Sequence, residues 1–197
     1  MPDALGSAIT NTDPNSCVTL QSDRFCKPWR LSTDGYTFMA VLESGMVNGT
    51  YQGKRVADGF IVQVYDDGFG IPTVGLGHKV LPQDNLRIGD VISVERARSF
   101  FDVNLLPIEE AINRELKVPL YQYEYDALVS VLFNSGPNHK PHDPWAGTRT
   151  QYLASFLNKG AYAKMPSVIR KFIDQRVPWR RRLEAKLFET GIYDARH

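Results

Sequence analysis

Cysteine is scarce in this sequence of 197 residues, and its two cysteines, Cys17 and Cys26, both lie in a polar N-terminal segment. Two ligands are too few for a structural metal site, so we expect no cysteine-based metal centre. Two alternatives remain open for the pair. Either both are free surface thiols, or they form a disulfide that closes a short loop, which would suit an oxidising compartment.

The sequence also lacks long apolar runs. None approaches the roughly 18–20 residues that cross a membrane, and no apolar N-terminal segment follows basic residues as it does in a signal peptide. We therefore expect no membrane span and no export by the general secretion route. A substrate outside the cell membrane would have to be reached with the help of separate delivery machinery.

An excess of charge of one sign is absent as well, because 23 basic and 22 acidic residues leave a formal net charge of +1. Such a chain has no overall field that would attract nucleic acid, so we predict no nucleic-acid partner. The densest basic run, Arg180 to Arg182, lies in an expected helix and cannot all face one way. We interpret it as a solvated helix face with one buried arginine.

The overall composition, with 43% hydrophobic and 23% charged residues, is typical of a soluble globular domain. Residues 1–31 are rich in Asp, Asn, Ser, Thr, Gly and Pro, which predicts an N-terminal extension or linker. Residues 32–197 are long enough for one domain, or for two lobes that share a core.

The first half of this domain predicts one helix and a sheet. The helix is expected to start at Ser32, Thr33 or Asp34, any of which can cap it, and to end before Gly45. Apolar and less apolar residues then alternate over residues 60–65, which predicts a strand buried mostly on one side. A small antiparallel sheet that continues through residues 73–74 follows from the turn signals around this strand.

Beyond residue 90 the patterns are helical. Capping residues, apolar stripes, and the prolines and glycines that begin and end helices set the expected bounds. Pro107 is predicted to separate two helices, because proline starts a helix more readily than it continues one. The expected helices cover about 93–106, 107–116, 122–134, 149–159, 166–173 and 178–190.

One segment, residues 65–78 (YDDGFGIPTVGLGH), carries a pattern with chemical meaning. In it Asp67 lies six positions before Thr73, and Glu43 lies upstream in the short sequence LESGM. A glycosidase needs one group that protonates the leaving oxygen and a second oxygen group on the opposite side of the sugar ring. Glu43 could supply the first, and Asp67 with Thr73 the second.

This segment resembles the active-site signature of phage-type lysozymes, the endolysins of glycoside hydrolase family 24. Two further segments resemble the family in the same order: YEYDALVSVLFNSG (123–136), its central core helix, and PWRRRLEAKLFETGIY (178–193), its C-terminal helix. The resemblance implies an α+β, lysozyme-like fold. In that fold a small antiparallel β lobe (about 46–78) packs against a larger helical lobe (about 90–193), with a cleft between them.

The resemblance assigns roles to single residues. Glu43 would be the general acid, which must keep its proton near neutral pH and is helped to do so by burial beside apolar groups. In the family an arginine of the C-terminal helix holds this glutamate, and Arg180 corresponds to it. Arg181 or Arg182 would take this role if the register differed. Asp67 would be the second, ionised carboxylate.

Asp66 is the neighbouring rival of Asp67. Because side chains alternate in an extended segment, we expect only one of the two to face the cleft, and the step to Thr73 selects Asp67. The alternative for Asp67 is a structural role in a turn. The resemblance gives Thr73 the role of the family's threonine, whose hydroxyl helps to hold the attacking water.

Four further residues are assigned supporting or binding roles. Gly77, like Gly75 before it, lets the backbone come close to a partner or to the sugar, since glycine has no side chain. His78 is expected to be a hydrogen-bonded structural residue rather than a catalytic one. Phe133 and Asn134 correspond to positions of the family's core helix that face the cleft, so they are candidate substrate contacts.

The sequence departs from the compact members of the family between Glu43 and Asp67, which lie considerably farther apart here. The extra residues, NGTYQGKRVADGFIVQV, predict a lengthened hairpin. Two interpretations remain open: an added glycan contact through Tyr51, Lys54 and Arg55, or simple loop drift.

A second cluster has the residue types of metal ligands. His139, His142 and Asp143 lie in the sequence SGPNHKPHDPWAG, but in a Pro-rich loop rather than on a helix. We therefore expect a stiff surface loop near the cleft and no metal site.

The predicted activity is hydrolysis of the β-1,4 bond between N-acetylmuramic acid and N-acetylglucosamine in peptidoglycan glycan strands, which lyses bacteria and needs no cofactor. We expect a monomer that acts on the cell wall of a host or target bacterium. A phage holin or an injection machine would deliver it, with an immunity protein as a partner in the second case. The alternatives are a chitinase-like glycosidase and a wall-binding module without catalysis; the matched acid and base argue against the module.

Overall fold

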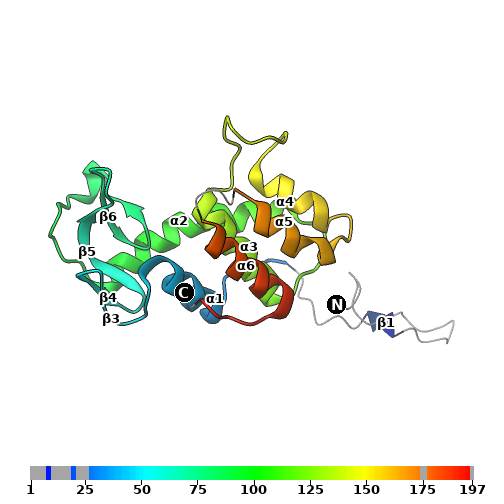
Figure 1. Cartoon of the computed structure of the whole chain (residues 1–197), viewed down its shortest axis with the longest axis horizontal. Helices are drawn as coiled ribbons and strands as arrows, with labels where there is room; N and C mark the ends of the chain where they lie inside the picture. Colours follow the sequence, from blue (N-terminus) through cyan, green and yellow to red (C-terminus); the bar gives the residue numbers. More distant parts are fainter. Residues whose placement is uncertain (1–7, 10–18, 21–26, 174–176, 196–197) are drawn as a thin grey trace. The chain divides into compact units, whose positions relative to one another are not determined.

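The computed structural model describes residues 8–9, 19–20, 27–173 and 177–195. The chain forms two compact units, and Figure 1 labels the six α-helices and most of the strands of these described residues. The helical unit comprises Met1–Ser32 and Ile108–Ile192. The sheet unit comprises Thr33–Pro107 and Tyr193–His197.

The N-terminal segment contains two short strands, β1 (Ala8–Ile9) and β2 (Thr19–Leu20), which pair antiparallel. Cys17 and Cys26 lie outside the described residues, so both alternatives for their thiols stay open. Within the described part of the chain, no helix combines the length and the apolar character that a membrane crossing requires.

The sheet unit is built on a five-stranded antiparallel sheet in which each strand pairs with the next one in the chain. The strands are β3 (Gly49–Tyr51), β4 (Lys54–Ala57), β5 (Phe60–Asp66), β6 (Pro72–Gly75) and β7 (His78–Lys79). This meander confirms the predicted small antiparallel sheet. The predicted lengthened hairpin is the β3–β4 pair, in which Tyr51 lies opposite Lys54.

β5 is the central strand, and its sequence explains why the sheet has a buried face and a more open one. Val62 and Val64 are buried, whereas Gln63 and Tyr65 are half-buried. Alternate side chains of a strand point to opposite faces, so this part of β5 presents its polar side chains together. The pairing of β5 with β6 shifts register between Ile61 and Tyr65.

α1 (Thr33–Ser44) starts within the expected range and buries its predicted apolar stripe. It ends before Gly45, whose φ of 74° is left-handed and is adopted most easily by glycine. The hydroxyl oxygen of Ser44 lies 2.9 Å from the carbonyl oxygen of Gly59 and ties the helix end to the turn between β4 and β5. Glu43 therefore sits on a helix end that the sheet holds in place.

α2 (Val94–Glu115) shows that the prediction of two helices divided at Pro107 was wrong, because the helix is continuous and Pro107 lies inside it. A proline in a helix interior removes one backbone donor and costs about 3 kcal/mol. Burial of side chains at helical spacing on both sides of the proline offsets this cost. These side chains belong to Phe101, Leu105, Ile108 and Ile112.

The helical unit contains four further helices close to their predicted places. They are α3 (Gln122–Ser135), α4 (Arg149–Leu157), α5 (Met165–Lys171) and α6 (Pro178–Thr190). α6 packs against both α3 and α5, and α4 contacts α5 (Figure 1). Single turns of 3-10 helix occur at η1 (Pro82–Asp84) and η2 (Tyr162–Lys164).

Local signals set the ends of these helices. The Thr148 hydroxyl accepts a hydrogen bond from the Gln151 backbone N–H at 3.1 Å, and the Gln151 side chain accepts one from the Thr148 N–H at 2.9 Å. This is the predicted capping box. Gly136 (φ 84°) follows α3 and Gly191 (φ 71°) follows α6, so both glycines end their helices as predicted.

Candidate active site

The predicted acid, second carboxylate and threonine all lie in the sheet unit. Glu43 is half-buried in the last turn of α1, Asp67 is half-buried in the turn after β5, and Thr73 is buried in β6. One compact unit thus carries the whole predicted set of reacting groups, although Glu43 is far from the other two in sequence.

The turn after β5 uses both neighbouring aspartates. Asp66 Oδ1 accepts hydrogen bonds from the N–H groups of Gly68 at 2.7 Å and Gly70 at 3.0 Å. Asp67 Oδ1 accepts from the N–H groups two and four residues further on, at 2.9 Å and 3.3 Å. Both bonds of Asp67 end on Oδ1. A turn role and a catalytic role are therefore compatible, because they need different oxygens of one carboxylate.

Thr73 belongs to a row of side chains across the sheet. It pairs with Tyr65 of β5 on one side and with Lys79 of β7 on the other. Directly opposite residues of an antiparallel ladder point to the same face, which we call the site face. The Thr73 hydroxyl donates to the carbonyl oxygen of Ile71 at 3.1 Å, so its lone pairs can still accept a hydrogen bond, as holding a water requires.

Tyr65 is a member of this site that the sequence analysis missed. Burial, together with the negative charges of Glu43 and then Asp67, raises the pKa of Tyr65. The helix α1 contacts β5, so charges from the end of α1 and from the turn after β5 both act on Tyr65. A signal was present in the sequence: Tyr65 lies two residues before Asp67, and alternate side chains of an extended segment share a face.

The arginine-bearing helix α6 belongs to the helical unit. Arg180 (3% exposed) and Arg181 (0%) are both buried, so the expectation of a single buried arginine in the run Arg180 to Arg182 was wrong. Glu184 explains why two are tolerated, since a buried cation is stable when it is paired. Its Oε1 accepts from Arg180 Nε at 2.9 Å and from the Ser130 hydroxyl at 2.7 Å, and its Oε2 accepts from Arg181 Nη1.

α3 carries the two predicted substrate contacts. Phe133 is half-buried, and Asn134 is exposed. Asn134 Oδ1 accepts a hydrogen bond from Arg181 Nη2 at 2.8 Å, which joins it to the arginine cluster. The roles of Phe133 and Asn134 toward substrate, and of Arg180 toward Glu43, stay predictions.

Comparison with known proteins identifies the family. The model of the family described as phage lysozyme matches residues 55–182, more than half of the chain. An endolysin from Acyrthosiphon pisum secondary endosymbiont phage 1 is 31% identical over 164 residues, which are 78% of this chain and 100% of the relative. The chain belongs to the phage lysozyme family. The predicted family is thereby confirmed.

Solved structures of phage lysozymes have a fold similar to that of this lysozyme. The endolysin from Escherichia coli O157:H7 phage FAHEc1 has a TM-score of 0.65 at 22% identity, over 86% of this chain and 99% of its own. A mutant of the P22 lysozyme has a TM-score of 0.58 at 26% identity, over 83% and 100%. The lysozyme-like α+β fold is confirmed. Membership also confirms a peptidoglycan-degrading muramidase over the chitinase and the wall-binding module.

The matched range includes Asp67, Thr73 and Arg180 but begins after Glu43. The role of Glu43 in the site of this lysozyme therefore stays a prediction. Its charge acts on Tyr65, as that of Asp67 does, and α1, which carries Glu43, contacts β5, which carries Tyr65.

His78 fixes the edge of the sheet in this lysozyme. Its Nε2 lies 3.0 Å from Asp84 Oδ2, its Nδ1 lies 3.4 Å from Asn104 Nδ2, and its ring stacks on Phe100 at 4.1 Å. Burial alone would raise the pKa of Asp84, but hydrogen bonds from the Leu81 backbone and from His78 outweigh it and hold that pKa below its ordinary value. These are the contacts of a structural residue.

Gly75 and Gly77 are needed for their backbone conformation and not because a side chain would lack room. Gly75 and Gly77 have φ values of 67° and 78°, which other residues adopt only with strain. A Cβ atom at Gly77 would meet nothing within 4 Å, and one at Gly75 would make only ordinary contacts. Close approach of another part of the chain is therefore not the reason for either glycine. Contact of the sugar with Gly77 stays a prediction.

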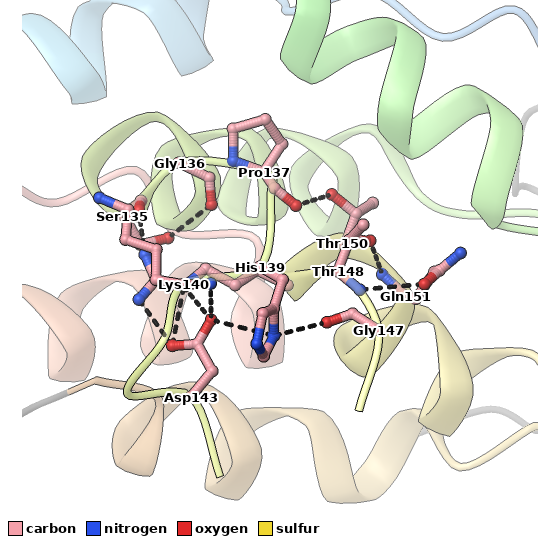
Figure 2. Close-up of polar contacts among 11 residues, drawn as sticks. Ser135, Gly136, Pro137, His139, Lys140, Asp143, Gly147, Thr148, Thr150 and Gln151 are labelled. Carbon is pink, nitrogen blue, oxygen red and sulfur yellow. Dashed lines mark hydrogen bonds and ion pairs between the residues drawn. The ribbon is translucent and has the colours of Figure 1, made fainter. Parts of the chain in front are cut away.

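The Pro-rich loop between α3 and α4 is braced from within, as Figure 2 shows. The Asp143 side chain, 3% exposed, accepts from Arg149 Nε at 2.9 Å and Nη2 at 2.7 Å, and from the Lys140 backbone N–H at 2.8 Å. The hydrogen bonds from Arg149 are the main reason that the pKa of Asp143 lies below its ordinary value. His139 Nδ1 lies 3.0 Å from the Gly147 carbonyl oxygen. Asp143 and His139 thus bond to groups of this loop and of the start of α4.

Proposed function

We propose that this lysozyme hydrolyses the β-1,4 bond between N-acetylmuramic acid and N-acetylglucosamine, with Glu43 as the acid and with Asp67 and Thr73 holding the attacking water. One observation carries the proposal. Tyr65 lies under the charges of both Glu43 and Asp67, and directly opposite Thr73 in the sheet. Two carboxylates and a hydroxyl are the groups that the proposed hydrolysis of the glycosidic bond uses.

The reaction divides the work between the two carboxylates. Glu43 gives its proton to the glycosidic oxygen as the bond to the anomeric carbon breaks, and positive charge develops on the sugar ring. A water held by Asp67 Oδ2 and Thr73 Oγ1 attacks that carbon from the opposite face, and its proton passes to Asp67. The backbone N–H bonds to Oδ1 orient Asp67 before substrate arrives, so little reorganisation is needed.

Thr73 favours inversion of the anomeric configuration. A retaining enzyme needs its second carboxylate about 5–5.5 Å from the acid, whereas an inverting one leaves room for water at about 6.5–9.5 Å. A hydroxyl whose own proton is bound to a carbonyl oxygen suits a holder of water. Proton NMR of the first product should show the α-anomer, and an initial β-anomer would mean that Asp67 attacks the carbon itself. Thr73→Glu should trap a covalent sugar adduct or make the enzyme retaining.

The bond specificity is tested by digestion of purified peptidoglycan, reduction of the new ends with borohydride, and mass analysis of the fragments. Reduced N-acetylmuramic acid ends are expected. Reduced N-acetylglucosamine ends, or anhydro ends that resist reduction, would overturn the proposed bond or the hydrolytic mechanism. Asp67→Asn and Asp66→Asn form a matched pair, because both aspartates accept two backbone N–H bonds but only Asp67 is assigned to water.

We further propose that the biological role is lysis of a phage host from within, by a monomer that reaches the cell wall through a holin. The endolysin relative supports this role over that of a toxin injected into rival bacteria. Expression in the bacterial cytoplasm should leave cells intact without a holin and lyse them with one. Protection of cells by a neighbouring immunity gene product would favour the toxin instead.

A further inference from the structure

The lengthened β3–β4 hairpin brings a cation to the site. Lys54 Nζ lies 4.0 Å from the centre of the Tyr65 ring. Tyr65 lies directly opposite Thr73 in the sheet, and the charges of both proposed catalytic carboxylates act on it. The hairpin therefore places the Lys54 side chain against Tyr65. A loop that had lengthened without function would not need this contact.

The sheet register explains why this lysine, and not its neighbour, reaches Tyr65. Val56 of β4 lies opposite Ile61 of β5, and Lys54 lies two residues before Val56 on the same face of β4. The long side chain of Lys54 reaches from this face to the ring of Tyr65, farther along β5. Arg55 is exposed and points to the other face, because side chains alternate along β4.

The site face carries a second cation. Lys79 lies opposite Thr73 in the β6–β7 ladder and is exposed. Tyr65 and Thr73 thus lie in one row with a lysine at its end, and Lys54 covers the Tyr65 ring. Two cations on the face that holds the reacting groups match a substrate with negative charge.

Neither a gain in stability nor proton donation by the general acid explains why a lysine lies over Tyr65. A lysine over an aromatic ring contributes only about 0.5–1 kcal/mol at exposed sites. A cation near a general acid favours loss of the acid's proton, which works against proton donation. Binding of an anionic group does account for it, since an ammonium that donates to a carboxylate makes one of the stronger hydrogen bonds in proteins.

We propose that Lys54, held over the ring of Tyr65, binds a carboxylate of the N-acetylmuramic acid unit at the scissile bond. The proposal rests on the proposed function, since N-acetylglucosamine carries no carboxylate. Two sources share this chemistry: the lactyl carboxyl of a muramic acid without its peptide, and the carboxylates of the peptide stem. Lys54 thereby gives the enzyme a preference for peptidoglycan over neutral glycans.

The test compares three glycans: native strands, strands stripped of their peptides by an amidase, and strands whose carboxylates have been converted to amides. Lys54→Met keeps the aliphatic stem over Tyr65 and removes the charge. It should raise KM on carboxylate-bearing strands about tenfold with kcat little changed, the size expected for loss of a charged hydrogen bond. On amidated strands Lys54→Met and wild type should have equal KM.

Two further variants separate the role of the charge from the role of the fold. Lys54→Arg keeps the cation and should restore most of the affinity, while thermal unfolding of all variants checks that the hairpin is intact. Arg55→Met removes the same charge from the opposite face of the same strand and should leave KM unchanged. Added salt should raise the KM of wild type more than that of Lys54→Met, because salt screens the pair.

The pattern over the three glycans identifies the bound group. A KM increase confined to native strands assigns a stem carboxylate, and an increase on stripped strands assigns the lactyl carboxylate. An equal increase on all three, amidated strands included, would overturn the proposal, as would an equal effect of Arg55→Met. If wild type released no muramic acid ends from any strand, the proposed function itself would be wrong, which is a separate and distinguishable result.

Discussion

Two carboxylates of this lysozyme, one in each unit, are held in opposite ways. Asp67 lies in a half-buried turn of the sheet unit, where neutral backbone N–H groups hold one of its oxygens. Glu184 has no exposed surface in the helical unit and is paired with two buried arginines, Arg180 and Arg181. Neutral donors orient a carboxylate and leave its charge in place, whereas two guanidinium groups neutralise it. The first arrangement suits catalysis, and the second suits a core.

Asp143 follows the pattern of Glu184, because its buried carboxylate is paired with Arg149. The partners of a carboxylate, and not its burial alone, therefore distinguish the two kinds. Removal of a site carboxylate should cost activity, and removal of an arginine-paired one should cost stability.

The largest effect is expected at the proposed acid. Glu43→Gln is nearly isosteric but removes the transferable proton, which should lower the hydrolysis rate by roughly 10²–10⁴-fold or more. Folding and glycan binding should stay close to those of wild type, as judged by thermal unfolding and by co-sedimentation with cell walls. Wall hydrolysis within a few-fold of wild type would remove Glu43 from the mechanism.

Glu184→Gln should have the largest effect on stability. It leaves two buried guanidinium groups without their common counter-charge, and breaking a buried ion pair in this way costs about 3–5 kcal/mol. Urea unfolding measures the loss. Glu189→Gln is the matched control on the same helix, since Glu189 is 45% exposed in its pair with Arg170 and such surface pairs contribute about 0–1 kcal/mol. Equal losses in the two variants would contradict the comparison.

The contribution of Asp143, the arginine-paired carboxylate in the α3–α4 loop, to the free energy of unfolding should depend on pH. Hydrogen bonds from Arg149 are the main cause that lowers the pKa of Asp143 below its ordinary value of 3.8 in the folded state. A lowered folded pKa gives stability that is fully present above the unfolded value and is lost as pH falls through the folded one. Asp143→Asn should thus be less stable than wild type at pH 6, and the difference should shrink below about pH 4. A difference that stays constant down to pH 2 would show that charge is not involved.

The smallest effect is expected from the hairpin. Replacement of residues 48–57 by a short turn removes Lys54 and Tyr51 but leaves β5 and the turn that holds Asp67. It should weaken binding to long glycan strands about tenfold, as loss of the Lys54 charge alone would, and slow the reaction of bound substrate by less. Binding isotherms and single-turnover rates separate the two quantities. Unchanged affinity would leave loop drift as the explanation of the extra length.

Local chemistry made several elements predictable. The glycines at 45, 136 and 191 end their helices because left-handed backbone suits residues without a side chain. The Thr148 capping box formed for a similarly local reason. Pro107 misled the prediction because its cost is local, whereas the burial that offsets it comes from packing along the whole of α2.

The sequence by itself determined the family, the order of the elements, and the motif that places Asp67 and Thr73 six residues apart, since each depends on residues close together in the chain. Only the tertiary structure decided that the charges of both carboxylates act on Tyr65, that Lys54 covers its ring, and that both Arg180 and Arg181 are buried with Glu184. The reason is physical. Charges and rings act over a few ångströms, and which distant residues come that close depends on how the whole of each unit packs.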